Sequence, residues 1–192
     1  MSVHPIVGSD RQQLVDSVSR VIRLDAELPD PVFDRELTRF YACDVLFALG
    51  GNFAHVLNRL GSHFGDRSCA LVARRPTASD FENRGTAGAL RIDLPVDDAE
   101  LWEAFNDEPG GDVTASMESA LESWVIVGES RKWACWCDRS YELAVLAAER
   151  ELSLENLDVP FQGVSDQVRE MLRLGSGELP NEALEKFESF YG

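Results

Sequence analysis

The side chains that could carry out nucleophilic or acid–base chemistry are few and lie far apart in the chain. The histidines are His4, His55 and His63, and the four cysteines include Cys43. Cys43 and His55 could form a thiol and imidazole pair, in which the imidazole takes the proton of the thiol. Because the sequence offers no third group to orient the imidazole, we expect both residues to be structural.

The spacing of possible ligands does not indicate a metal site. His55 and His63 lie eight residues apart, roughly two turns of a helix, and are too distant to share an ion unaided. Cys135 and Cys137 would point to the same face of a strand, but a structural zinc ion needs two further ligands at suitable spacing. We therefore predict no metal and no other cofactor.

Asp44 interrupts the apolar stripe of a predicted helix, between Tyr41 and Val45. A buried carboxylate has to be paired, hydrated or protonated, because an unpaired buried charge costs several kcal/mol. We expect a structural partner such as an arginine. The enzymatic alternative is a small enzyme that uses carboxylates or Cys43, and it would require a concave pocket that holds strongly perturbed acids.

The net charge is the strongest overall property of the sequence. The 18 basic and 34 acidic residues give a formal net charge of −16 and a sequence pI near 4.5. Such a surface repels phosphate backbones and anionic lipids, which argues against nucleic acid and membrane partners. A basic protein partner fits this charge, and so does a role in solubility alone.

The sequence predicts a cytoplasmic protein. Residues 1–13 lack the positively charged start and apolar core of a signal peptide. No apolar run approaches the roughly 20 residues needed to cross a bilayer. The cysteines lie inside apolar segments, where a reducing compartment would leave them as small buried hydrophobes.

Length and composition favour one compact domain over residues 1–192. We divide it into an N-terminal helical part (9–65), a sheet-forming part (68–148) and C-terminal helices (163–191). The apolar spacing predicts three helices in the first part, from Ser9 to Leu24, from Pro31 to Ala48 and from Asn52 to Phe64. The last two would form a helical hairpin.

The hydrophobic period changes after Ser68. Leu90, Ile92 and Leu94 alternate with polar residues, which is typical of a strand. Three apolar runs between Ser123 and Ala148 predict an antiparallel meander, and because both faces are apolar we expect cover on both sides. The fold is predicted to be α+β, a mainly antiparallel sheet of about five strands with helices packed over it. The predicted strands are 68–74, 88–94, 124–128, 132–137 and 141–147.

The segment from Asp97 to Asp112 is acidic and contains no basic residue. Its start has the pattern of a helix cap and predicts a short helix to about Asn106. One interpretation is a docking surface, because negative charges held close together would attract a cationic partner. The other is a solvated helix face. The predicted partner-binding residues are Asp97, Asp98, Glu100, Glu103, Asp107 and Glu108.

Three of the four tryptophans, Trp124, Trp133 and Trp136, fall in the meander, and core positions are the simplest interpretation. If Trp136 faces outward near Arg131 or Arg139, that edge is a candidate binding hot spot, because aromatic and arginine anchors dominate binding energy. Trp136, Arg131 and Arg139 therefore complete the predicted partner-binding residues.

Residues 133–146, WACWCDRSYELAVL, form a tryptophan-bearing strand, an Asp-Arg turn and an aromatic, acidic and aliphatic strand. This pattern is similar to a hairpin of small bacterial immunity proteins of toxin systems. The resemblance spans residues 123–147 and identifies no toxin contact. It implies a cytoplasmic α+β protein that neutralises a toxin by direct binding, with no chemistry of its own.

We therefore predict a non-enzymatic acidic binding protein, an immunity or inhibitor protein that neutralises a basic protein toxin. Two other classes stay open. One is the small enzyme described above. The other is a structural domain that forms homo-oligomers through an exposed apolar face of its C-terminal helices.

Overall fold

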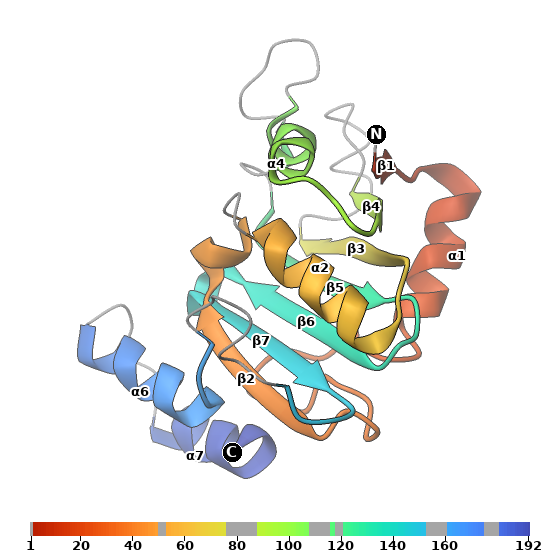
Figure 1. Ribbon diagram of the computed structural model, residues 1–192. Coiled ribbons are helices and arrows are strands. Elements are labelled where there is room, and N and C mark those ends of the chain that lie inside the picture. Colours follow the sequence, from red (N-terminus) through yellow and green to blue (C-terminus); the bar gives the residue numbers. More distant parts are fainter. Residues whose placement is uncertain are drawn as a thin grey trace.

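A computed structural model describes residues 2–49, 53–75, 88–107, 116–117, 121–152, 161–174 and 181–192. These residues form an α+β fold with a seven-stranded sheet in the order β1-β4-β3-β5-β6-β7-β2, in which all neighbours are antiparallel (Figure 1). The strands are β1 (Val3–Pro5), β2 (Arg39–Asp44), β3 (Ser68–Arg75), β4 (Ala89–Asp93), β5 (Ser123–Gly128), β6 (Trp133–Asp138) and β7 (Leu143–Ala148).

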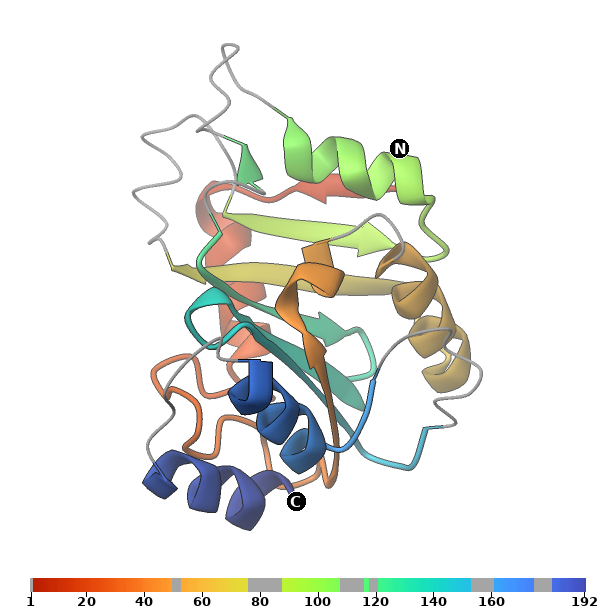
Figure 2. The ribbon, with the colours of Figure 1, turned by 90° about the vertical axis from the view of Figure 1, so that its left-hand side faces the viewer.

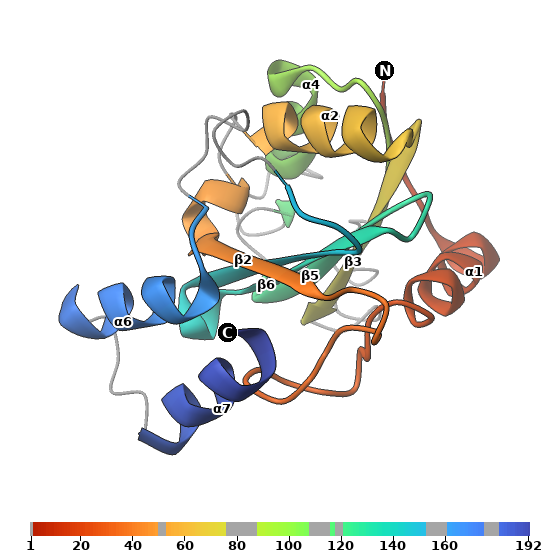
Figure 3. The same ribbon diagram turned by 60° about the horizontal axis from the view of Figure 1, so that its bottom comes forward.

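Helices cover the sheet on both sides. The α-helices of the described residues are α1 (Gly8–Val18), α2 (Phe53–Phe64), α4 (Asp98–Asn106), α6 (Val164–Leu174) and α7 (Asn181–Tyr191). Figure 3 shows α2 and α4 on one side of the sheet, with α1 and α7 on the other. A connection over residues 19–38 joins α1 to β2 on the second side.

The sheet separates two hydrophobic cores. Alternate residues of β6 divide between them: Trp133 and Cys135 face the core of α2 and α4, while Ala134 and Trp136 face the core of α1 and α7. All residues of β5, β6 and β7 are buried. The prediction that the meander is covered on both sides is therefore confirmed.

The five predicted strands are present, but the sheet has two more at its edges. The first is β1, which has three residues, one of them a proline, and is too short to show a period. The second is β2, which pairs with β7 along its whole length, from Arg39 opposite Ala148 to Asp44 opposite Leu143. The predicted helix from Pro31 to Ala48 and the helical hairpin are wrong, because a short apolar run fits both periods and pairing with β7 decided the outcome.

Asp44 is also placed differently from the prediction. It is exposed at the end of β2, where its carboxylate accepts a hydrogen bond of 2.8 Å from the backbone N–H of Leu46. It thereby caps the short 3₁₀ helix η1 (Val45–Leu49). The expectation of an arginine partner rested on a buried carboxylate. Because the Asp44 carboxylate is exposed, it needs no such partner.

The other helices follow the sequence pattern with shifted ends. Helix α1 stops at Val18 instead of Leu24, because Ile22 forms an antiparallel bridge with Phe33. Helices α2, α4, α6 and α7 lie where the apolar spacing places them. At α4 the cap is confirmed, since the Asp97 carboxylate accepts a hydrogen bond of 2.8 Å from the N–H of Ala99.

Candidate protein-binding surface on helix α4

The orientation of α4 is fixed by two apolar side chains one turn apart. Leu101 and Phe105 are both 1% exposed and belong to the core on the α2 side. Successive residues of a helix are rotated by about 100°. Trp102, which follows Leu101, is therefore turned away from the core, and its side chain is 50% exposed.

Three exposed carboxylates lie close to Trp102 along the helix. Asp98 lies one turn before it on the same side of the helix, Glu103 follows it, and Asp107 comes just after the last turn. Within the described part of the chain, none of these three carboxylates forms an ion pair. A half-exposed indole with three exposed carboxylates near it along the helix is therefore the most distinctive feature of this surface.

The remaining acidic residues of the segment have structural tasks or fall outside the described residues. Asp97 caps the helix, as described above. Glu100 is half-buried and accepts a hydrogen bond of 3.1 Å from the backbone N–H of Ser2, and hydrogen bonding by Ser2 lowers the pKa of the Glu100 carboxyl. The predicted contact Glu108 lies outside the described residues. The candidate surface, which we call the α4 surface, thus consists of Asp98, Trp102, Glu103 and Asp107.

The structure does not bring the three predicted meander residues together. Trp136 is fully buried, and the guanidinium that lies over its ring belongs to Arg74, at 3.9 Å from the ring centroid. Arg131 and Arg139 flank opposite ends of β6, which separates them by roughly 20 Å. Trp136 is therefore not available as a surface anchor.

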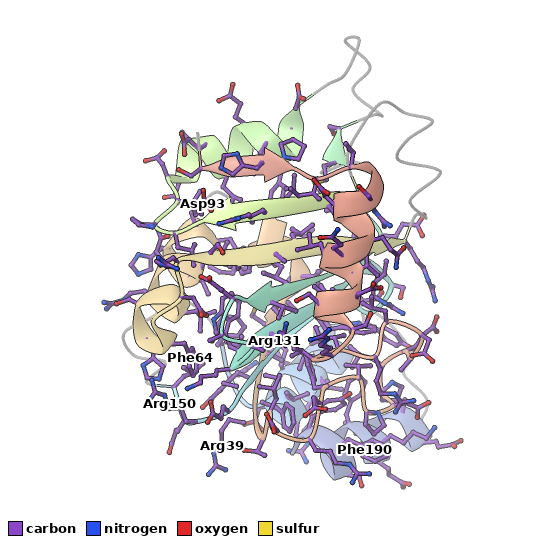
Figure 4. All side chains as sticks on the ribbon, turned by 90° about the vertical axis from the view of Figure 1, so that its right-hand side faces the viewer. Arg39, Phe64, Asp93, Arg131, Arg150 and Phe190 are labelled. Atoms are coloured by element: carbon purple, nitrogen blue, oxygen red, sulfur yellow. The ribbon has the colours of Figure 1, made fainter. Side chains whose placement is uncertain are left out.

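Arg131 lies in the turn between β5 and β6, near the C-terminal end of α1 (Figure 4). Its guanidinium donates a hydrogen bond of 3.2 Å to the Ser17 hydroxyl. The turn joins β5 and β6, which lie two and three strands from β4, whereas α4 lies beside β1 at the edge of the sheet. Arg131 and the α4 surface are consequently separate features.

Asp66 organises the β5–β6 turn, a role that no local sequence pattern predicts. This buried carboxylate accepts hydrogen bonds from the backbone N–H of Ser130 (2.6 Å), the Ser130 hydroxyl (3.1 Å) and the Trp133 indole N–H (2.7 Å). A Cβ on Gly128 would lie 2.3 Å from Trp133 Nε1 and 2.4 Å from Asp66 Oδ2. Only glycine leaves room for this arrangement.

The thiols do not form a reactive site. Cys43, Cys69, Cys135 and Cys137 are all buried, and burial raises the pKa of Cys43, Cys69 and Cys137. Cys43 lies in the core while His55 is exposed on α2, so the two do not form the thiol and imidazole pair. Among the residues that the structure describes, no group of three or more histidine, cysteine, aspartate or glutamate side chains could hold a metal ion.

Comparison with protein-family models, curated proteins and solved structures finds no match to this chain. Of the helices in the described ranges, none has both the length and the apolar composition that a membrane span requires. The functional argument therefore starts from the α4 surface itself.

Proposed function

We propose that this chain is a non-enzymatic binding protein whose α4 surface binds a basic protein partner. The observation that carries the proposal is the half-exposed Trp102 near the exposed carboxylates of Asp98, Glu103 and Asp107 on one helix. An exposed indole keeps apolar area in water, and burial of that area favours association. Tryptophan is also among the residues most enriched at energetic hot spots.

The chemistry of the surface selects a cationic partner. The carboxylates attract lysine and arginine over a distance of about 8 Å at physiological ionic strength and so raise the rate of encounter. An arginine or lysine of the partner can then lie over the Trp102 ring, a contact worth roughly 0.5–2 kcal/mol. Together these groups recognise a basic segment with an apolar contact at its centre.

The class of binding protein that we propose is an immunity or inhibitor protein that neutralises a basic toxin by covering its surface. The net charge of −16 supports this class, since it suits a strongly basic partner. The meander hairpin supports it through its similarity to bacterial immunity proteins. In this proposal the chain contributes affinity and steric cover, and no bond is made or broken.

The test measures partner binding by variants of the α4 surface. Basic proteins captured from the native host are purified, and their affinity is measured for the wild type, Trp102→Ala and Asp98→Asn/Glu103→Gln. We expect each variant to weaken binding by about tenfold or more. The matched control is Glu182→Gln/Glu185→Gln on α7, which removes the same charge from two exposed positions and should bind like the wild type.

The inhibitor class is tested on the partner's own activity. Stoichiometric addition of this protein should abolish the toxic activity, and Trp102→Ala should restore it at the same concentrations. Affinity that is unchanged in both α4 variants would exclude the α4 surface. A partner that binds through α4 and keeps full activity would exclude inhibition while leaving the surface intact.

A further inference from the structure

The connection over residues 19–38 folds into an ordered hairpin despite having no regular strand. Ile22 and Phe33 form an antiparallel bridge. The N–H of Arg23 donates to Val32 O, and the N–H of Asp34 donates to Val21 O, each at 2.7 Å. Connections longer than roughly 12–15 residues inside a compact fold are usually functional, which makes this segment a candidate for a site.

Two side chains from distant elements hold the hairpin in place. Arg74 of β3 donates to Leu24 O from Nε (3.1 Å) and Nη2 (3.0 Å), and to Ala26 O from Nη2 (2.7 Å). The Tyr191 hydroxyl of α7 donates to Asp30 O (2.6 Å) and accepts from the N–H of Val32 (3.1 Å). The geometry of the hairpin is thereby fixed before any ligand binds, which lowers the entropy cost of binding.

The hairpin encloses a hollow of about 390 Å³. Three arginines line it, Arg20, Arg23 and Arg35. Its apolar wall includes Val21, Ile22 and Phe33. This combination of an apolar wall with a few charged groups is typical of sites for small molecules.

Among the residues that the structure describes, the arginines of the hollow form no ion pair with a carboxylate, and Arg23 donates a hydrogen bond of 3.1 Å to Pro31 O. Glu27 pairs with Arg75, and Asp30 pairs with Lys186 at 3.3 Å. Arg20 and Arg35 form no ion pair with any residue that the structure describes. The one carboxylate on the lining, that of Asp34, accepts a hydrogen bond of 3.1 Å from the N–H of Glu36.

In a chain with a net charge of −16, the lining of the hollow carries three arginines and one carboxylate. The guanidinium group is planar, stays protonated and matches the oxygens of phosphate with paired hydrogen bonds. Three such groups exceed what a single carboxylate can accept, whereas a dianionic phosphate has three charged oxygens. The apolar wall beside them suits a ligand with an apolar body.

We infer that the hollow binds a small phosphomonoester, with its phosphate against Arg20, Arg23 and Arg35 and its apolar body against Val21, Ile22 and Phe33. The site is independent of the α4 surface. Figures 1 and 2 place α4 and the 19–38 connection at opposite ends of the molecule. Loss of either activity would therefore leave the other in place.

The test uses phenyl phosphate as the probe, with inorganic phosphate and benzoate for comparison. Binding to the full chain is measured by calorimetry, and amide shifts in NMR spectra locate the site. Phenyl phosphate should bind saturably, with shifts in residues 19–35, and at least about fivefold more tightly than inorganic phosphate because the wall adds apolar contact. Benzoate, which has a single carboxylate, should bind more weakly than phenyl phosphate.

Variants identify the charged groups that are responsible. Arg20→Gln and Arg35→Gln should each weaken phenyl phosphate binding by about tenfold, the value expected for a lost charge-assisted hydrogen bond. Both side chains are exposed, so folding should be retained, and the far-UV circular dichroism spectrum checks this. Arg20→Lys keeps the charge but loses the planar fork, and it should also weaken binding.

The matched control is Arg67→Gln, because Arg67 is an exposed arginine outside the hollow and forms an exposed ion pair with Glu129. It removes the same charge and should leave binding unchanged. The proposal is overturned if phenyl phosphate does not bind saturably, if the shifts fall elsewhere, or if Arg67→Gln weakens binding as much as Arg20→Gln.

Discussion

The guanidinium carbon of Arg74 on β3 lies 3.9 Å from the centroid of the Trp136 ring on β6, across the intervening strand β5. This cation–π contact joins the sheet to the 19–38 hairpin, because the same guanidinium donates to Leu24 O and Ala26 O. A further hydrogen bond of 2.9 Å to the Ser123 hydroxyl completes its contacts. Through Arg74, Trp136 thus helps to hold the hairpin that contains the proposed phosphate site.

Arg74→Met should destabilise the protein by about 3 kcal/mol, because it keeps the alkyl stem but leaves Leu24 O and Ala26 O without their donor. The measurement is the free energy of unfolding in urea. Arg74→Lys should recover little, since a lysine has no planar fork for two carbonyls and a ring. The control is Arg75→Met, which breaks the exposed pair with Glu27 and should cost less than about 1 kcal/mol. Equal losses for the two positions would contradict the structural role of Arg74.

Gly128→Ala should destabilise by about 2 kcal/mol, because the added methyl group meets Trp133 Nε1 and Asp66 Oδ2 far inside contact distance. Thermal unfolding measures the effect. At Gly163 a Cβ would lie 3.5 Å from Asp166 Oδ2, an ordinary contact, so Gly163→Ala serves as the control and should change stability little. A Gly128→Ala variant as stable as the wild type would mean that Asp66 does not hold the Trp133 indole.

Trp102 should account for nearly all of the fluorescence that ionic quenchers can reach, because the other three tryptophans are fully buried. The carboxylates near Trp102 attract cations, so at low salt caesium should quench better, and iodide worse, than each quenches the free uncharged indole N-acetyltryptophanamide. Trp102→Phe should remove the quenchable fraction. If caesium gains nothing and iodide loses nothing relative to that free indole, the local field at the α4 surface is not negative and the proposed docking chemistry fails.

The thiols should resist alkylation in the native protein. Burial raises the pKa of Cys43, Cys69 and Cys137, so these thiols stay protonated from neutral to moderately alkaline pH and offer little thiolate to iodoacetamide. Mass spectrometry should find no rapid modification in the native state and four modified cysteines after denaturation. Rapid modification of one thiol, abolished by Cys43→Ser, would instead favour the small enzyme considered from the sequence.

The sequence by itself determined the α+β class, the meander, the capped acidic helix and the sign of the charge. Each of these depends on local information: the period of apolar residues, a capping aspartate at position 97, and a count of ionisable groups. Two-sided burial of β6 was also predictable, because both of its faces are apolar.

Only the tertiary structure decided which side chains meet. The sequence of residues 39–44 fits a helix as well as a strand, and pairing with β7 makes it a strand. The direction of the Trp136 side chain is likewise set by tertiary packing, which brings Arg74 over its ring. Trp102, Leu101 and Phe105 belong to one helix. Trp102 faces outward only because Leu101 and Phe105 pack into the core on the α2 side. Packing also brings Arg20, Arg23 and Arg35 of the 19–38 hairpin to the lining of one hollow. Contacts between residues distant in sequence are set by packing and not by local spacing.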